Sequence, residues 1–130
     1  MKSSAPKKVK YEFPMKLPSL NDYVNKCRTH PQAGNAMKTA VQKQLGRLIM
    51  AQGIKRMNPP VNVHFTWYEA NKRRDKDNII SAQKYILDSL VQMHVLGDDN
   101  WDWINQIDHR VHLARDRKHI VHVVLEEIGK

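Results

Sequence analysis

Four aspartates form two short acidic segments in a chain that is otherwise strongly basic. Asp75 and Asp77 lie within residues 72–78, whose sequence is Lys-Arg-Arg-Asp-Lys-Asp-Asn, and Asp98 and Asp99 follow about twenty residues later. Acids beside a dense basic run weaken nonspecific attraction to polyanions, so their position requires another reason. A hard divalent cation is the simplest one, because Mg²⁺ and Mn²⁺ take carboxylate oxygens. A cation held among basic residues suits phosphodiester chemistry on a nucleic acid.

Ordinary structural roles compete with this metal site. If Asp77 begins a helix, its carboxylate can accept hydrogen bonds from the free N–H groups of the first turn. That role does not explain Asp75 or the adjacent acids at 98–99. Two adjacent carboxylates repel one another, and the ordinary alternative for such a pair is an exposed surface loop. The metal site instead requires Asp75, Asp77 and Asp99 to converge from two loops at the two ends of one helix.

A helical wheel adds Lys84 to the acidic group. Steps of four, three and four residues lead from Asp77 to Ser81, Lys84 and Asp88, and they return to nearly the same azimuth of an α-helix. Lys84 is therefore a candidate to contact a phosphate or to stabilise developing negative charge. The alternative is a solvated lysine paired with Asp88, although lysine before aspartate is the weaker orientation for such a pair.

The composition suits one basic globular domain. The chain has 130 residues, of which 41% are hydrophobic, and this is enough for one core. Lys and Arg outnumber Asp and Glu by 22 to 13, which gives a net charge of +9 and predicts a polyanionic partner. The single cysteine, Cys27, excludes an internal disulfide and favours a reducing compartment. No apolar run approaches the ~20 residues that cross a bilayer. Residues 1–8 lack the apolar core of a secretion signal and are predicted to be a disordered lead before a single domain at 9–130.

The hydrophobic periodicity predicts an α+β fold with two helices packed on a small mixed sheet, in the order β-α-β-α-β-β. The predicted strands are 9–13, 61–68, 104–113 and 119–128, and the predicted helices are 33–52 and 77–93. Residues 14–31 are expected to be irregular, and 69–74 and 97–103 to be loops.

Two aromatic and three basic residues have competing interpretations. Trp101 and Trp103 follow the second acidic segment and are expected to pack against the sheet or a dimer partner, although such residues also stack on bases. Lys38, Lys43 and Arg47 are expected to form a solvated helix face, with a second strip of DNA contacts as the alternative.

The histidine pairs do not favour a zinc site. His109 and His112 lie in one predicted strand, and His119 and His122 lie in the next. A spacing of three residues in a strand puts the two side chains of a pair on opposite faces.

Several of these residues resemble the RusA family of Holliday junction resolvases. The matching segments are Arg73-Arg74-Asp75-Lys76-Asp77-Asn78, Leu87-Asp88-Ser89-Leu90 and Asp98-Asp99. Leu17-Pro18-Ser19-Leu20-Asn21 looks like the family's Pro-rich, Asn-containing segment after its first strand, so the resemblance spans roughly residues 10–128. It implies a RusA-like fold and a homodimeric, magnesium-dependent endonuclease, with manganese as the alternative ion. Such an enzyme resolves four-way DNA junctions by paired symmetric nicks in recombination and repair. It also implies a cytoplasmic protein that is encoded by a bacterium or a phage.

The resemblance assigns roles to particular positions. It makes Asp75, Asp77 and Asp99 the catalytic metal ligands, with Asp98 as an accessory ligand. Lys84 takes the place of the family's functional lysine, and Ser81 takes that place in an alternative alignment. The residues expected to grip adjacent DNA phosphates are Lys72, Arg73, Arg74 and Lys76.

Two other functions remain compatible with the sequence. One is a noncatalytic DNA-binding accessory protein of recombination, in which the acids only cap a helix. The other is a nuclease that acts on different branched or flapped DNA within the same fold. The residues favour metal chemistry on a phosphodiester, whereas the choice of a four-way junction depends on the resemblance alone.

Overall fold

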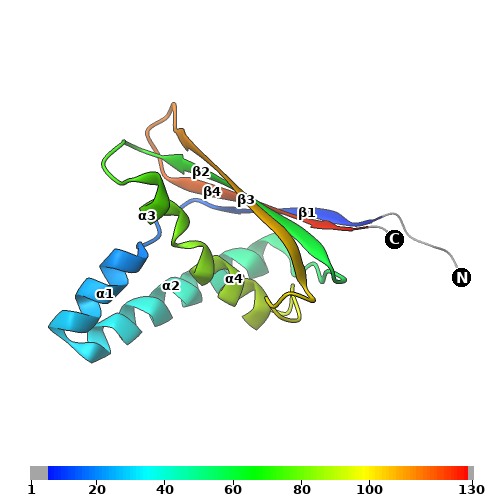
Figure 1. Ribbon diagram of the computed structural model, residues 1–130, viewed down its shortest axis with the longest axis horizontal. Helices are drawn as coiled ribbons and strands as arrows, with labels where there is room; N and C mark the ends of the chain where they lie inside the picture. The colour runs from blue at the N-terminus through cyan, green and yellow to red at the C-terminus, as the bar shows by residue number, and fades with distance from the viewer. Residues whose placement is uncertain (1–5, 129–130) are drawn as a thin grey trace, which may run out of the picture.

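The computed structural model describes residues 6–128, which form a four-stranded sheet with helices against one of its faces (Figure 1). The elements in chain order are β1 (Lys8–Phe13), α1 (Leu20–Thr29), α2 (Pro31–Gln52), β2 (Val61–Glu69), α3 (Lys76–Ile80), α4 (Gln83–Gln92), β3 (Ile104–Leu113) and β4 (Ile120–Glu127). The predicted α+β class is confirmed.

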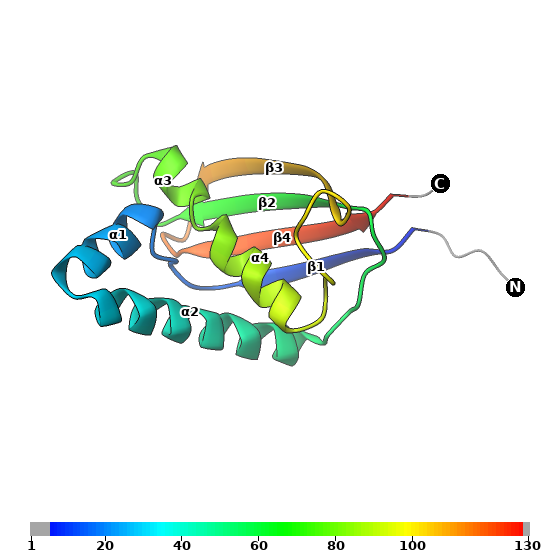
Figure 2. The same cartoon turned by 60° about the horizontal axis from the view of Figure 1, so that its bottom comes forward.

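The sheet is mixed, as predicted, with the strand order β1-β4-β2-β3. β2 and β3 run parallel, whereas β4 is antiparallel to both β1 and β2. A parallel pair needs a crossover connection, and α3 and α4 form it (Figure 2). The chain therefore leaves one end of the sheet after β2 and returns to the opposite end before β3. The first acidic segment begins this crossover, and the second closes it.

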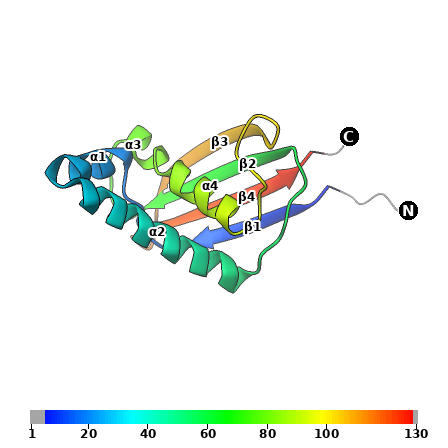
Figure 3. The same ribbon diagram turned by 90° about the horizontal axis from the view of Figure 1, so that it is seen from below.

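The core lies between the helices and the covered face of the sheet, as the view in Figure 3 makes clear. Phe65 and Trp67 of β2 are almost completely buried, and so are Leu45 and Ile49 of α2 and Ile86 of α4. These residues belong to the apolar stripes and the alternating strand pattern of the sequence. The apolar residues that recur at helical spacing in both segments therefore form the faces that pack on the sheet.

Helix α1 occupies a segment that the sequence predicted to be irregular, and this prediction was wrong. The helix begins with a capping box, in which Ser19 Oγ accepts from Asp22 N at 3.1 Å and Asp22 Oδ2 accepts from Ser19 N at 2.8 Å. Pro31 does not interrupt α1, because it lies at the first position of α2, where proline is well tolerated. The Ser-x-x-Asp pattern at 19–22 indicates the start of a helix. The prolines at 18 and 31 favoured an irregular segment instead.

The helix predicted at 77–93 is divided into α3 and α4. At Ser81 and Ala82 the backbone stays right-handed, but Ala82 N donates to Ile79 O, three residues back, at 3.2 Å. Ser81 Oγ also donates to Asn78 O at 2.6 Å, so its hydroxyl competes for the helical carbonyls. A short stretch of tighter turns therefore separates the two helices and changes their direction.

The N-terminal lead is shorter than predicted. Lys8 pairs with Glu126 at the start of β1, and Lys7 N donates to Glu127 Oε1 at 2.9 Å, so the prediction of disorder was wrong for these two lysines. Of the remaining residues, Pro6 is exposed and outside any helix or strand, and residues 1–5 lie outside the described part of the chain. None of the helices within residues 6–128 is both long and apolar enough to cross a membrane.

Candidate metal and nucleic-acid site

Asp75 and Asp77 lie at the start of α3 with exposed carboxylates. Asp75 takes the N-cap position, but its side chain makes no capping hydrogen bond. Asp77 Oδ1 accepts only from the backbone N–H of Asn78, at 3.0 Å. Neither carboxylate forms an ion pair with another residue of the described chain. Helix capping therefore does not account for this acidic pair.

A hollow of about 560 Å³ opens beside Asp75, between the β2–α3 loop and the end of β3. Its polar lining includes Lys72, Lys76 and His112. A carboxylate with two lysines at the edge of one hollow is a combination that suits a cation and a phosphate together.

Arg74 has a structural position that the sequence did not reveal. Its Nη2 donates to Glu69 Oε1 at 2.9 Å and its Nη1 to Leu17 O at 2.8 Å. Both side chains of the ion pair are mostly buried, with 17% of Arg74 and 8% of Glu69 exposed. The guanidinium is thus already engaged within the protein, which argues against the phosphate contact predicted for it.

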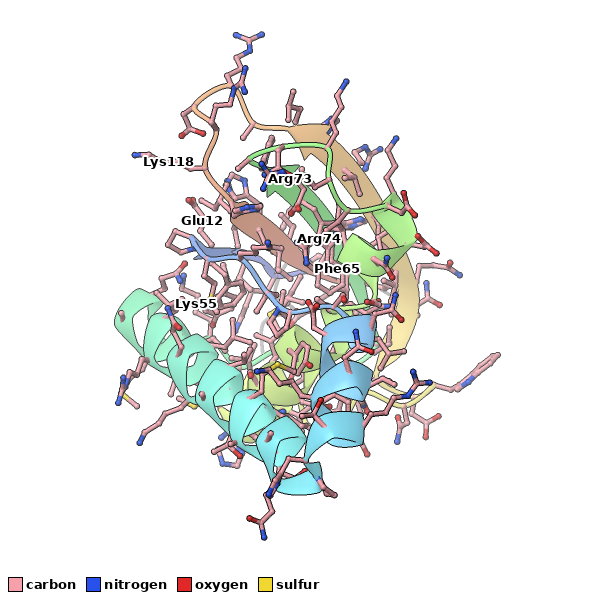
Figure 4. The ribbon with its side chains drawn as sticks, turned by 90° about the vertical axis from the view of Figure 1, so that its left-hand side faces the viewer. Glu12, Lys55, Phe65, Arg73, Arg74 and Lys118 are labelled. Atoms are coloured by element: carbon pink, nitrogen blue, oxygen red, sulfur yellow. The ribbon has the colours of Figure 1, made fainter. Side chains whose placement is uncertain are left out.

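Arg73 differs from its neighbour because it is exposed and its side chain is free of such partners within the described chain (Figure 4). Lys72 and Lys76 are exposed as well. The sequence feature that separates Arg74 from Arg73 is Glu69. It continues the alternation of buried and partly exposed residues along β2, and it falls on the buried face. A buried carboxylate needs a partner. Arg74 Nη2 donates to one oxygen of Glu69 at 2.9 Å, and His119 Nδ1 lies 3.5 Å from the other.

The segment at residues 17–21 contacts both the first acidic segment and the end of α3. Leu20 N donates to Ser81 Oγ at 3.0 Å, and Asn21 Nδ2 donates to Asn78 Oδ1 at 2.9 Å. The carbonyl of Leu17 also accepts from Arg74. Together these contacts hold the β2–α3 loop and α3, which carry Asp75 and Asp77. Two segments of the resemblance, far apart in the sequence, are therefore in direct contact.

Lys84 joins the second acidic segment to α4. Its ammonium lies 2.9 Å from Asp99 Oδ2 and 3.0 Å from Asp88 Oδ1. The hydrogen bond to Asp99 raises the pKa of Lys84, and the same bond lowers the pKa of Asp99. From Lys84 to Gln92 the helix rises about 12 Å, so the loop at 97–103 must return along α4 to bring Asp99 to this lysine.

Asp98 serves the loop itself. Its Oδ1 accepts from Asp99 N at 2.7 Å, and its Oδ2 accepts from Asn100 Nδ2 at 3.2 Å. Both carboxylate oxygens are therefore used to shape the turn. This position argues against the accessory ligand role expected for Asp98.

The three expected metal ligands are not gathered in one group. Within residues 6–128, no cluster of three or more Asp, Glu, His or Cys side chains is placed to hold a metal ion. Asp99 contacts Lys84, whereas Asp75 and Asp77 remain at the start of α3. The exposed carboxylates of Asp75 and Asp77 are of the type that Mg²⁺ takes, since this ion keeps several waters and needs one or two carboxylates together with substrate phosphate. Asp75 lines the hollow of about 560 Å³, whereas Asp77 is not part of its lining.

The predicted shared face of Ser81, Lys84 and Asp88 is present. These three residues line a small hollow, which Lys38 of α2 also borders. Asp77 does not line it, because the break at Ser81 turns α3 away from α4. The other two basic residues predicted on the solvated face of α2, Lys43 and Arg47, are exposed.

The two tryptophans of the second loop differ in environment. The ring of Trp103 covers Gly97 so closely that a side chain at that glycine would overlap it, so the predicted packing is confirmed for Trp103. Trp101 is 97% exposed, and the predicted packing is absent within the described chain.

His109 and His112 lie on opposite faces of β3, as predicted. His119 was predicted in the same strand as His122, but it precedes β4, which begins at Ile120. His109 stacks on Phe65 with ring centroids 4.8 Å apart and accepts from Trp67 Nε1 at 3.0 Å. Burial lowers the pKa of His109. His112 lies on the uncovered face near Tyr68, so the pair does not form a shared metal site.

A scan of this chain against protein-family models finds no match, and a search of the curated proteins finds none either.

Proposed function

We propose that this protein is a metal-dependent endonuclease of the RusA type, which nicks four-way DNA junctions. The observation that supports it best is the contact between Lys84 and Asp99. It brings the second acidic segment back along the helix that leads from Asp75 and Asp77. It also puts the ammonium of Lys84 beside the second acidic segment, and a lysine in such a place can stabilise negative charge on a phosphate.

Asp75 and Asp77 are the proposed metal ligands, because their carboxylates are exposed and unpaired within the described chain. A bound Mg²⁺ or Mn²⁺ supplies an activated water and stabilises negative charge on the attacked phosphate. Lys84 binds an oxygen of the same phosphate. When it does so, Asp99 loses its ammonium partner and becomes free to serve the site as a third carboxylate.

Lys72, Arg73 and Lys76 are proposed to hold the adjacent phosphates of the DNA. All three are exposed around the first acidic segment. Arg74 supports them indirectly, since its contacts with Glu69 and Leu17 fix the loop. Contacts of this kind release counterions, so binding should weaken steeply as salt rises.

A two-fold homodimer is proposed as the working form. Two identical sites related by a two-fold axis match the two symmetric strands of a four-way junction. Sedimentation of the protein alone and with a junction tests this part, and one protomer per junction would contradict it.

A noncatalytic DNA-binding protein is the second candidate function. The specific observation in its favour is that Lys84 neutralises Asp99 while no three-acid cluster is formed. In that case the basic surface would bind DNA, and the acids would only shape the loops.

Nicking assays separate these functions. Wild-type protein is incubated with four-way junction, fork, flap and duplex substrates, each with Mg²⁺ and with a chelator. The proposal expects Mg²⁺-dependent, paired nicks in the junction. Preferred cleavage of a fork or flap would indicate a nuclease for other branched DNA, and binding without any nicking would indicate the accessory protein.

A further inference from the structure

Trp101 is the most exposed large hydrophobic side chain of residues 6–128, with 97% of its surface accessible. Met50 and Leu20 follow at 63% and 58%. An indole in water leaves a large apolar surface unburied, and such a side chain commonly marks a place where something else binds. Trp101 lies two residues after Asp99, so this exposed surface adjoins the candidate site.

The loop that presents Trp101 is held in place by hydrogen bonds. Asn100 Oδ1 accepts from Asp102 N at 3.0 Å and from Trp103 N at 3.3 Å. Asn100 O also accepts from Ile104 N at 2.9 Å. The turn on both sides of Trp101 is therefore fixed before any ligand arrives. A preorganised aromatic side chain binds its partner with a smaller loss of conformational entropy.

A hollow of about 320 Å³ lies beside Trp101 at the start of β3. Ile104 and Ile107 supply apolar lining, Gln106 supplies an amide, and Asp99 borders the same hollow. The amide of Gln106 makes no hydrogen bond with another side chain of the described chain, so both its donors and its acceptor are available. A flat apolar wall with a free amide beside it suits the face and edge of a nucleobase.

We infer that this hollow is a nucleobase subsite, in which an unstacked base of the DNA stacks on Trp101 next to the phosphate at Lys84. The inference rests on the proposed function. Stacking on aromatic side chains is the usual way in which proteins hold unpaired bases. The net charge of +9 favours a nucleic acid over an apolar protein segment as the occupant.

The charges of the loop itself favour a base over a phosphate in this hollow. Asp98, Asp99 and Asp102 surround Trp101 in the sequence, and they repel a phosphate that approaches the tip. The bases are neutral, and the amino groups of adenine, cytosine and guanine can donate hydrogen bonds to carboxylate and amide oxygens. The backbone of the DNA would therefore follow Lys84, while the base turns toward Trp101.

The test measures junction binding in the absence of divalent metal, with Trp101→Ala, Trp101→Phe and the control Met50→Ala. Trp101→Ala should lose affinity by about 5- to 150-fold, the ratio that corresponds to about 1–3 kcal/mol of stacking per base. Trp101→Phe should retain most of the affinity, because a phenyl ring still stacks. Met50→Ala removes an exposed apolar side chain from α2 and should bind as wild type does.

A series of junctions with one abasic nucleotide at successive positions locates the stacked base. At one position, the difference between wild type and Trp101→Ala should disappear. Equal binding by wild type and Trp101→Ala to the intact junction would overturn the subsite. A defect that persists at every abasic position and accompanies weaker self-association in sedimentation would also overturn it, since Trp101 would then pack against a second copy.

This design separates the subsite from the nuclease. Wild type that binds junctions but does not nick them with Mg²⁺ refutes the proposed catalysis, while the binding comparison still decides on Trp101. Wild type that binds no DNA refutes both proposals.

Discussion

The Nζ of Lys84 lies 2.9 Å from Oδ2 of Asp99, fifteen residues further along the chain. This ion pair closes the loop at 97–103 onto α4 and ties the two acidic segments to the same crossover. It also gives Asp99 a cationic partner in the protein without metal. If the proposed function is right, a divalent cation and Lys84 compete for this carboxylate, and the competition can be measured.

Substitution Lys84→Met should lower the Mg²⁺ concentration needed for half-maximal nicking, because Asp99 loses its competing ammonium. The rate at saturating Mg²⁺ should fall by about 10²–10³-fold, since one charge that stabilises the transition state is removed. Nicking rates over a Mg²⁺ titration measure both effects, with Lys43→Met on the exposed face of α2 as the control. An increased Mg²⁺ requirement would contradict the competition.

Arg73 and Arg74 are neighbours in sequence but should respond differently to replacement by glutamine. Arg74→Gln removes the guanidinium from the buried Glu69 carboxylate, leaving only His119 Nδ1 at 3.5 Å, and should reduce the free energy of unfolding by about 3–5 kcal/mol. Arg73→Gln should change it by less than about 0.5 kcal/mol and should weaken DNA binding instead. Denaturant unfolding of both variants measures the loss of stability. DNA binding of both variants at several salt concentrations measures the loss of phosphate contacts. Equal stability of the two variants would show that Arg74 is not structural.

Gly97→Ala should disturb the second loop. A Cβ at position 97 overlaps the ring of Trp103, and overpacking of this kind costs about 1–3 kcal/mol of stability. The ring must move outward, so its fluorescence should become more accessible to a soluble quencher. Gly46→Ala, where the added carbon meets only the flexible side chain of Met93 at 3.4 Å, is the matched control. An undisturbed Trp103 in Gly97→Ala would mean that the close packing is not real.

His64 should make stability depend on pH. Burial lowers its pKa, but hydrogen bonds from the ring to Glu126 and Asp108 raise it more, and the net direction is upward from 6.5. A raised pKa means that the folded state holds the proton more tightly. The resulting stabilisation is complete below about pH 6.5 and is lost as pH rises through the folded value.

The measurement is the free energy of unfolding of wild type minus that of His64→Gln, from about pH 6 to pH 9. The difference should be largest at the acidic end and should decrease as pH rises. Taking the difference cancels the contributions of His109 and His122, whose pKa values are lowered by burial. A difference that grows with pH would contradict the assigned direction.

The sequence predicted much of the fold because its elements have clear hydrophobic periods. Apolar residues alternate with polar ones in β2, and Leu45 and Ile49 recur at helical spacing in α2. These apolar residues are the buried ones, so the hydrophobic pattern of the sequence indicates burial directly. Helix α1 was missed because no residue in it is fully buried, so its main signal was the capping box at Ser19. The prolines at positions 18 and 31, on either side of it, instead favoured an irregular segment.

The candidate site was less predictable because it depends on contacts between distant residues. The wheel that grouped Asp77 with Lys84 assumed one helix, and the Ser81 hydroxyl breaks that helix. The inward position of Arg74 follows from Glu69 at the end of β2, which only the strand pattern could have suggested. Where Asp99 returns along α4 depends on the loop, and no local pattern encodes it.

The most direct test of the central claim is nicking of a four-way junction by Asp77→Asn in the presence of Mg²⁺. Asp116→Asn, in the exposed turn between β3 and β4, removes the same charge away from the site and serves as the control. If Asp77 holds the metal, Asp77→Asn should bind the junction at least as tightly as wild type does and nick it at least about 100-fold more slowly. Nicking by Asp77→Asn at the wild-type rate would contradict this role of Asp77.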